Sequence, residues 1–132
     1  MMPRSPSSPH PRRLAAELFG RRGERLAAWY LRAKFYTIVA ERVRTPVGEI
    51  DLVARRGGVT VFVEVKARRS SQSYGDALAA VNRRRISRAA GYYLSRHPRL
   101  AATSLRFDVI FLAPMRWPRH LKHAFDASQD VT

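Results

Sequence analysis

Apolar and polar residues alternate with the two-residue period of a β-strand in three successive segments of the chain. Residues 35–43 alternate loosely and stop before Pro46, as an edge strand would. Residues 48–54 and 59–67 are the clearest strands, and the Gly57-Gly58 pair between them is a tight-turn signal. The pattern predicts three consecutive strands, of which the last two form a hairpin.

Helical spacing appears on both sides of these strands. The apolar residues 14–19 are interrupted by the segment from Gly20 to Gly23, and a firmer helix is expected over about residues 22–33. After a polar loop, a long helix is predicted over about residues 76–96, and Pro98 stops it. A strand over residues 105–112 and a short last element over residues 121–127 follow. The buried stripe of the long helix is expected to comprise Leu78, Val81, Ile86, Ala89, Ala90 and Tyr93.

This order of elements predicts an α/β fold, an α-β-β-β-α-β sandwich around a mixed central sheet. Residues 13–128 are expected to form a single domain. Residues 1–12 are expected to be a disordered, basic tail rich in proline and serine, and residues 129–132 a second tail. No apolar run approaches the roughly 18 to 20 residues of a membrane span, and the amino terminus lacks the apolar segment of a signal peptide, so a cytoplasmic protein is expected.

The composition adds a functional constraint, because 25 lysines and arginines against 10 acids give a net charge of +15. So large a charge on 132 residues favours a polyanionic partner, either nucleic acid or an anionic membrane surface. The membrane surface ranks last, since no basic amphipathic helix with a bulky apolar face is evident. The absence of cysteine excludes thiol catalysis, disulfides and cysteine-bound zinc.

Two of the scarce acids are predicted to face each other in the most apolar part of the chain. The alternation puts Val59, Val61, Val63 and Val65 on one face of their strand, and Thr60, Phe62, Glu64 and Lys66 on the other. In the preceding strand, Ile50 and Leu52 share one face, opposite Glu49, Asp51 and Val53. A two-residue turn at Gly57-Gly58 pairs Arg56 with Val59, which sets Asp51 across from Glu64 and Glu49 across from Lys66.

Directly opposed carboxylates repel each other, and a divalent cation would offset the repulsion. Asp51, Glu64 and a backbone carbonyl, that of Val65, form a partial shell for Mg²⁺ or Mn²⁺. Lys66 would then orient or deprotonate an attacking water or neutralise the charge that develops on phosphorus, with Glu49 as its neighbour. The alternative is a solvated ladder of ion pairs among the same side chains. Phe62 favours the metal site, because a central strand is covered on both faces.

The spacing Asp51, twelve residues, then Glu64-Val65-Lys66 resembles the PD-(D/E)XK signature of restriction-endonuclease-like nucleases. The wider match, over about residues 19–127, resembles the YraN-like family of small, uncharacterised bacterial proteins. It is carried by Arg22-Gly23-Glu24, Gly48-Glu49-Ile50-Asp51-Leu52, residues 61–68, residues 106–110 and Ala124-Phe125. The resemblance implies a restriction-endonuclease-like fold.

Similar archaeal Holliday-junction resolvases carry a glutamate on the first helix, and Glu24 matches that position. The resemblance therefore implies Glu24 as a helper at the site, and first-turn stabilisation of a helix is the equal alternative. The chain departs from the family at Asn82, where a lysine is usual, and at Glu41-Arg42, which replaces an Arg-Asn pair. The arginines that follow Asn82 could supply the phosphate contact that the usual lysine would make.

The remaining candidates are basic, aromatic or histidine side chains. Six arginines are expected to contact phosphate rather than form a solvated face, namely Arg68, Arg69, Arg83, Arg84, Arg85 and Arg88. Tyr74 and Gly75 either line a groove or pack. Asp108 is expected to form a structural ion pair with Arg106, and His120 with His123 is poor evidence for zinc. Trp29 and Trp117 are expected to pack in the core or at an edge rather than stack on bases.

Two function classes follow from these features. The first is a Mg²⁺- or Mn²⁺-dependent nuclease that cuts phosphodiester bonds, and analogy alone favours DNA over RNA and a branched or flapped form of DNA. The second is a non-catalytic module that keeps the fold and binds nucleic acid or recruits a partner protein. Junction-cutting relatives act as two-fold dimers, so a homodimer stays open.

Overall fold

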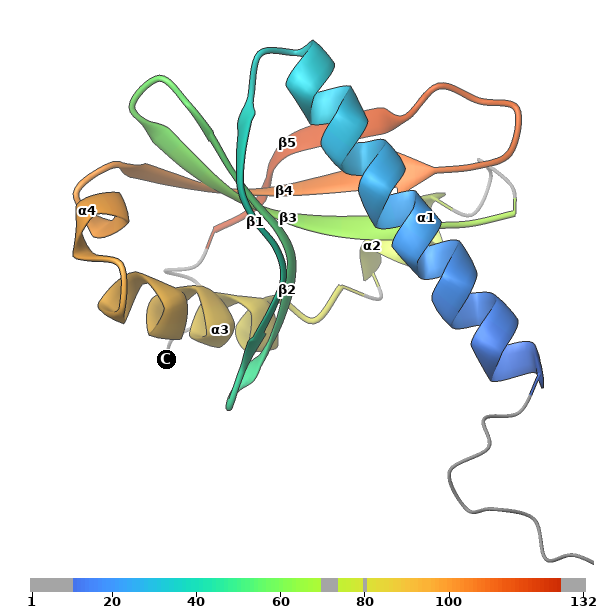
Figure 1. The fold of residues 1–132 in the computed structure, drawn as a ribbon, viewed down its shortest axis with the longest axis horizontal. Helices are drawn as coiled ribbons and strands as arrows, with labels where there is room; N and C mark the ends of the chain where they lie inside the picture. The colour runs from blue at the N-terminus through green and yellow to red at the C-terminus, as the bar shows by residue number, and fades with distance from the viewer. Residues whose placement is uncertain (1–10, 70–73, 80, 127–132) are drawn as a thin grey trace, which may run out of the picture.

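The computed structural model describes residues 11–69, 74–79 and 81–126. Residues 1–10 and 129–132, which carry most of the two expected tails, lie outside the described residues. The elements run in the order α1 (Pro11–Ala33), β1 (Thr37–Thr45), β2 (Gly48–Arg56), β3 (Val59–Ala67), α2 (Tyr74–Ala79), α3 (Arg83–Ser95), α4 (Pro98–Ala101), β4 (Ser104–Leu112) and β5 (Arg119–Phe125) (Figure 1).

The five strands form one mixed sheet in the order β1-β2-β3-β4-β5. β3 and β4 are parallel, and the other neighbouring pairs are antiparallel. β1 lies at an edge, as the loose alternation of residues 35–43 predicts. The expected α/β fold around a mixed central sheet is therefore confirmed, and the short last element is the full strand β5.

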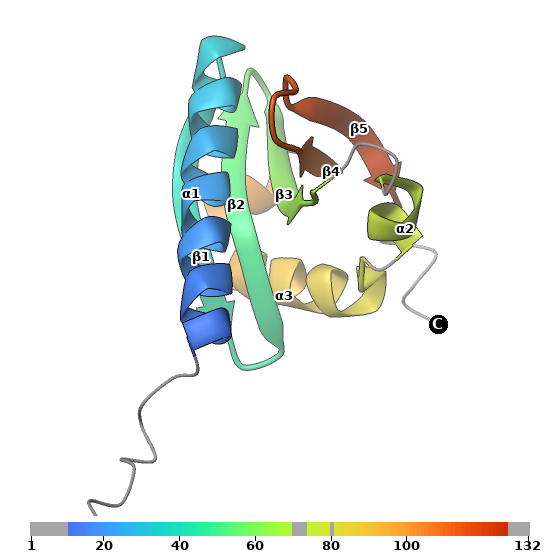
Figure 2. The ribbon, with the colours of Figure 1, turned by 90° about the vertical axis from the view of Figure 1, so that its right-hand side faces the viewer.

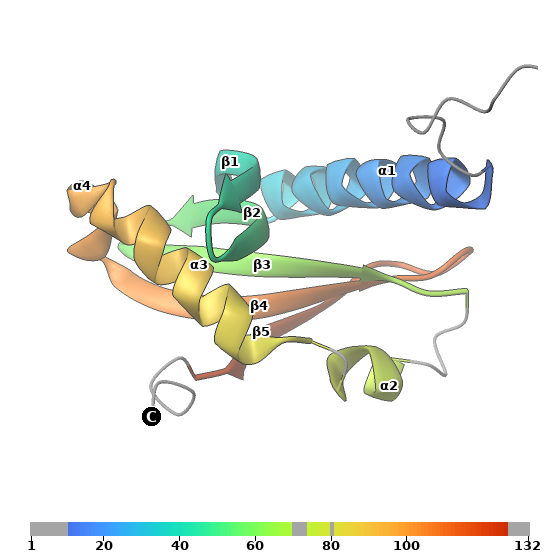
Figure 3. The ribbon, with the colours of Figure 1, turned by 90° about the horizontal axis from the view of Figure 1, so that it is seen from below.

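Helices cover both faces of the sheet, with α1 on one side and α3 on the other (Figures 2 and 3). The valine face of β3 packs under α1, where Val61 and Val63 meet Ala27, Ala28 and Leu31. On the opposite face Phe62 belongs to a second cluster with Ile86, Ala89 and Tyr93 of α3. Two separate cores on either side of β3 explain why its sequence is apolar on both faces. Within the described residues, no helix combines the length and apolar character needed to cross a membrane.

The hairpin of β2 and β3 has the predicted register, from Arg56↔Val59 through Leu52↔Val63. One face assignment is wrong, because Ile50 does not share a core with Leu52. Leu52 lies under α1, whereas Ile50 belongs to the cluster beneath α3. The reason is the strong twist of β2, which together with β1 curls toward α3 (Figure 1).

The expected interruption of the first helix at Gly20 to Gly23 is wrong, because α1 runs through all four residues. Gly23 is buried, and a Cβ built on it would lie 3.2 Å from Cδ1 of Leu112. This glycine lets the helix approach the sheet closely. Glu24 is therefore in the middle of a helix that begins at Pro11, which excludes stabilisation of a first helical turn as its role.

The expected long helix over residues 76–96 is also wrong, since two helices replace it. Asn82 between them has φ −84° and ψ 88°, outside the helical region, and its side-chain oxygen accepts a hydrogen bond from the backbone N–H of Arg85 at 3.1 Å. This is an N-cap, so a new helix begins at Arg83. The predicted buried stripe is retained across both pieces, with Leu78 half-buried.

Candidate active site

Asp51 and Glu64 meet where the β2–β3 ladder ends. The last paired residues are Leu52 and Val63, one step before the two acids. Beyond that step, Oδ2 of Asp51 accepts a hydrogen bond from the backbone N–H of Val65 at 2.8 Å. The carboxylate thus occupies the position of a strand carbonyl, and it ties the diverging strands together at the site.

The two acids perturb each other's protonation. Burial raises the pKa of Glu64 to about 7, the charge of Asp51 adds to this rise, and Lys66 opposes it. Burial also raises the pKa of Asp51, against the opposing effects of the Val65 N–H and of a hydrogen bond with Glu64. Two partly buried carboxyl groups with raised pKa values favour sharing a proton over ionising side by side. That position is electrostatically suited to a cation.

Lys66 lies beside this pair, with its Nζ 3.3 Å from Oε1 of Glu64. Both side chains are mostly buried, with 22% of Lys66 and 17% of Glu64 exposed. The ammonium is therefore held at the acids rather than extended into solvent. Glu49, expected opposite Lys66, forms a loose ion pair with Arg44 instead, with 3.9 Å between Nε and Oε1.

A cavity of about 290 Å³ joins these side chains to the amino-terminal end of α3. It is lined by Glu49, Asp51, Glu64 and Lys66 from the strands, and by Asn82, Arg85 and Ile86 from the helix. Gly48 fixes this junction, because a Cβ built there would lie 2.8 Å from Cγ of Arg85 and 3.1 Å from its carbonyl oxygen. The hairpin and the helix touch directly, which brings a guanidinium to a pocket that already holds three acids.

Glu24 lies near the acids but in a different depression, which it lines with Arg25, Glu41 and Arg42. Its Oε2 is 3.3 Å from Nε of Arg42, and that Nε makes no hydrogen bond with any described residue. Burial raises the pKa of Glu24 to about 7, and the charge of Asp51 is the next cause. The charge of Asp51 thus affects the protonation of Glu24, whereas the ion-pair partner of Glu24 is Arg42. The backbone of Arg42 has the left-handed φ of 51°.

The donor set fits a hard divalent ion that keeps part of its water. Among the described residues, no three histidine or acidic side chains converge to form a complete cage. Asp51 and Glu64 supply two carboxylates, while the Val65 N–H that donates to Oδ2 of Asp51 holds that carboxylate in place and is not itself a metal ligand. Mg²⁺ is commonly held by one or two carboxylates, with water and phosphate oxygens completing its shell.

The six arginines do not form one patch. Arg85 lines the acidic cavity, whereas the guanidinium of Arg83 lies 5.9 Å from the ring centre of Phe125. Arg84, Arg88 and Arg69 are exposed, and Nη1 of Arg68 donates a hydrogen bond to the carbonyl of Ala67 at 3.0 Å. The amino-terminal turn of α3 is wholly basic and contains no acidic residue.

Asp108 forms the structural ion pair that its sequence predicts. It is fully buried, and Arg106 contacts it at 2.8 Å and Nε2 of His120 at 2.6 Å. Nδ1 of His120 in turn lies 2.9 Å from Nζ of Lys34, so this histidine stabilises the core. Sequence reasoning missed the link because Lys34 and His120 are far apart in the chain.

The aromatic candidates divide differently from the expectation. Tyr74 is buried and stacks on Phe111 with ring centres 4.9 Å apart, so it packs rather than lines a groove. The expected packing of the two tryptophans is wrong, because Trp29 is 72% exposed and Trp117 is 89% exposed. For Trp117, the sequence signal for exposure is its place in the mostly apolar segment 113–118, which falls between two strands rather than within one.

Comparison with known proteins gives consistent matches. A sequence model described as "Uncharacterised protein family UPF0102" matches residues 23–112. A "UPF0102 protein" of Parvibaculum lavamentivorans is 50% identical over 112 residues, which cover 85% of this chain and 84% of the relative. One of Methylorubrum extorquens is 46% identical over 93% of this chain and 96% of its own length, and one of Rhodopseudomonas palustris is 51% identical over 95% and 94%.

Proposed function

The chain belongs to the uncharacterised protein family UPF0102, and we propose that it is a metal-dependent nuclease that hydrolyses phosphodiester bonds in nucleic acid. The observation that carries the proposal is the pair of partly buried carboxyl groups of Asp51 and Glu64 with Lys66 beside them. Three of the protein's 10 acids and one of its lysines line a single cavity, and acids so close together repel one another. Such a cluster of perturbed groups is typical of a functional site.

Asp51, Glu64 and the carbonyl of Val65 would hold Mg²⁺ or Mn²⁺ in this proposal. When bound, the ion would supply Lewis acidity at the phosphate and a more acidic water. The two carboxyl groups must release the proton that they share before they bind a cation. The site is therefore proposed to work best above the pKa of about 7 that burial and Asp51 impose on Glu64.

Lys66 would act on the water or on the phosphate. Its Nζ is anchored by Oε1 of Glu64 at 3.3 Å, so it can donate a hydrogen bond to an attacking water while remaining at the site. It can equally stabilise the negative charge that develops on the phosphate oxygens. Glu24, with a pKa raised to about 7, is proposed as a helper that either transfers a proton or holds an outer-sphere water by a hydrogen bond.

The substrate is proposed to be held from the α3 side of the cavity. Arg85 lines the cavity and Asn82 caps the helix beside it, so a phosphate there meets a guanidinium and the positive end of a helix dipole. The arginine takes the place of the lysine that the family usually has at Asn82. These contacts would position the sugar-phosphate backbone of the nucleic acid without recognising its bases.

The restriction-endonuclease-like resemblance supports DNA over RNA, and a branched or flapped form. The observed helix, three strands, helices and parallel strand follow the same order as that core. The second candidate function is a binding module without turnover. It is favoured by the Lys66–Glu64 ion pair and by the absence of a complete protein cage among the described residues, since both also suit a site that never binds metal.

The test compares the wild type with Asp51→Asn on labelled single-stranded, duplex, flap and four-way-junction DNA and on RNA, each with Mg²⁺, Mn²⁺ or EDTA. Asp76→Asn, at an exposed acid on α2, is the matched control. Metal-dependent cutting that survives in the control and disappears in Asp51→Asn is the expected result. Tight, salt-sensitive binding without cutting in all three proteins would favour the binding module.

A further inference from the structure

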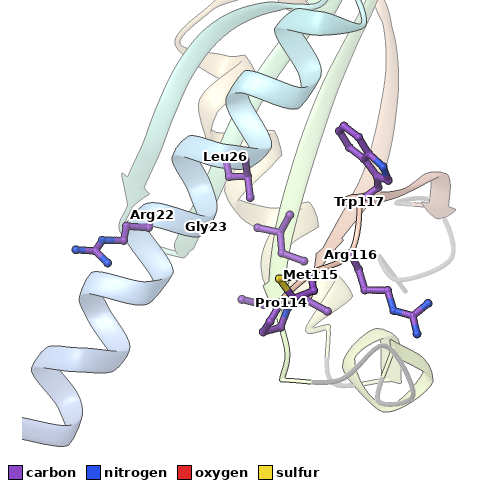
Figure 4. Close-up of a pocket in the computed structure, with 10 residues that line it drawn as sticks. Arg22, Gly23, Leu26, Pro114, Met115, Arg116 and Trp117 are labelled. Carbon is purple, nitrogen blue, oxygen red and sulfur yellow. The ribbon is translucent and has the colours of Figure 1, made fainter.

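A second cavity, of about 560 Å³, lies between α1 and the loop that joins β4 to β5. Figure 4 shows its two walls, with Arg22, Gly23 and Leu26 on the helix and Pro114, Met115 and Trp117 on the loop. Ala67 and Leu112, from the ends of β3 and β4, also line it. This cavity is distinct from the acidic one and is mainly apolar.

Its apolar side chains are unusually open to solvent. Met115 is fully exposed, Trp117 is 89% exposed and Leu26 is 54% exposed. Met115 also has the left-handed φ of 61°, a conformation that is strained for a non-glycine residue. A strained loop that presents a methionine and a tryptophan to water indicates a surface that a ligand covers.

The charge around the cavity indicates the chemistry of that ligand. Among the described residues that line it there are two arginines, Arg22 and Arg116, and no acid. In Figure 4 their guanidinium groups point outward at opposite ends of the apolar lining. An exposed aromatic face with arginines on both walls of the cavity matches a nucleotide, whose base stacks while its phosphates meet the arginines. A second copy of this chain is a poor occupant, because each copy carries a net charge of +15.

The position of the cavity relates it to the acidic site. Ala67 directly follows Lys66 on β3, and Gly23 directly precedes Glu24 on α1. Adjacent residues of a strand point to opposite faces, so the two cavities open on either side of the end of β3. A nucleic acid that reaches both must turn a base away from the strand that carries the phosphate.

We propose that this cavity binds an unpaired base next to the phosphate at Asp51 and Glu64, with Trp117 as the stacking surface. A base inside a duplex is covered by neighbours on both faces and cannot stack on Trp117. The cavity would therefore select single-stranded, flapped or junction DNA over continuous duplex. This inference rests on the proposed function for the location of the phosphate, and it specifies the substrate class.

The test measures binding rather than cutting, in EDTA, with single-stranded, flap and fully duplex oligonucleotides that carry 2-aminopurine at the same position. Trp117→Ala is expected to weaken binding of the single-stranded and flap DNA by on the order of 5- to 100-fold and to leave duplex binding unchanged. It should also change the 2-aminopurine fluorescence of the bound flap. Trp117→Phe keeps an aromatic face and should restore most of the affinity.

Trp29→Ala is the matched control, since Trp29 is 72% exposed on α1 and does not line the cavity. Equal losses for flap and duplex, or no loss for either, would overturn the proposal. The proposal would also be overturned if the wild type sedimented as a dimer and Trp117→Ala as a monomer, because Trp117 would then hold two copies of the chain together. If Asp51→Asn and the wild type both fail to cut but the Trp117 pattern holds, the base site stands and the nuclease does not.

Discussion

Replacing Asp51 with asparagine is expected to stabilise the metal-free protein at pH 8 and to abolish its response to a divalent metal. In the folded chain the pKa of Glu64 is raised from 4.5 to about 7 by burial and by the charge of Asp51. The folded state therefore holds a proton that the unfolded state loses between these two values. Stability falls as the pH rises through this window, because the folded state must then ionise both acids side by side.

The magnitude follows from the same shift. A pKa change from 4.5 to about 7 corresponds to about 3 kcal/mol, of which burial is the largest cause and Asp51 the next. Removing the charge of Asp51 should therefore return about 1 kcal/mol, or a rise in Tm of roughly 3 °C. Asparagine keeps a carbonyl oxygen for the Val65 N–H, and its amide can donate to Glu64 where the shared proton was.

The assay is thermal unfolding followed by circular dichroism, at pH 5 and pH 8, with EDTA or with millimolar Mg²⁺ or Mn²⁺. In EDTA, the wild type should lose more stability than Asp51→Asn between pH 5 and pH 8. Metal should raise the Tm of the wild type at pH 8, have little effect at pH 5, and have none on the variant, since ligands bind cations only when ionised. Asp76→Asn should behave as the wild type.

Two results would refute this reasoning. If Asp51→Asn is less stable than the wild type in EDTA at pH 8, the hydrogen bond to Val65 outweighs the repulsion, and the acids are a structural pair. If metal raises the Tm of both proteins equally, the ion binds elsewhere. The comparison of two proteins at each pH cancels the titration of all other groups.

Three other perturbations test the framework around the site. Gly48→Ala should destabilise the fold by about 1 to 3 kcal/mol in urea, because its Cβ would lie 2.8 Å from Cγ of Arg85 at a φ of 154°; an unchanged midpoint would contradict this packing. Arg85→Glu should weaken DNA binding and lower the slope of log Kd against log salt by about one for each phosphate that is no longer neutralised. The same charge reversal at the exposed Arg99 of α4 should change neither quantity. Asp108→Asn should cost about 3 to 5 kcal/mol, since it removes the buried partner of Arg106 and His120. Burial alone would raise the pKa of Asp108, but hydrogen bonds from His120 and Arg106 hold it below its ordinary value. The stability advantage of the wild type over Asp108→Asn should therefore shrink in acid titrations as the pH falls below about 4.

Local patterns in the sequence were sufficient for the hairpin that positions the acids. The period of two in residues 59–67 separates a valine face from a face with Glu64 and Lys66, and the Gly57-Gly58 turn sets the register. A shift by one residue would expose the valines, so a single register satisfies the pattern. Periodicity and turn chemistry involve only neighbouring residues, which is why they could be read without a structure.

Contacts between distant segments decided the rest. Ile50 joined the α3 core because of sheet twist, Gly23 served helix–sheet contact rather than a break, and the cap at Asn82 divided the expected long helix. Arg44 became the partner of Glu49, and Trp117 remained exposed beside α1. The sequence alone thus determined which residues share a strand face and how the hairpin pairs. Only the tertiary structure decided which helix covers each face and which side chains stay open to a ligand. Both depend on packing between segments that are far apart in the chain, which the local periodicity of either segment does not report.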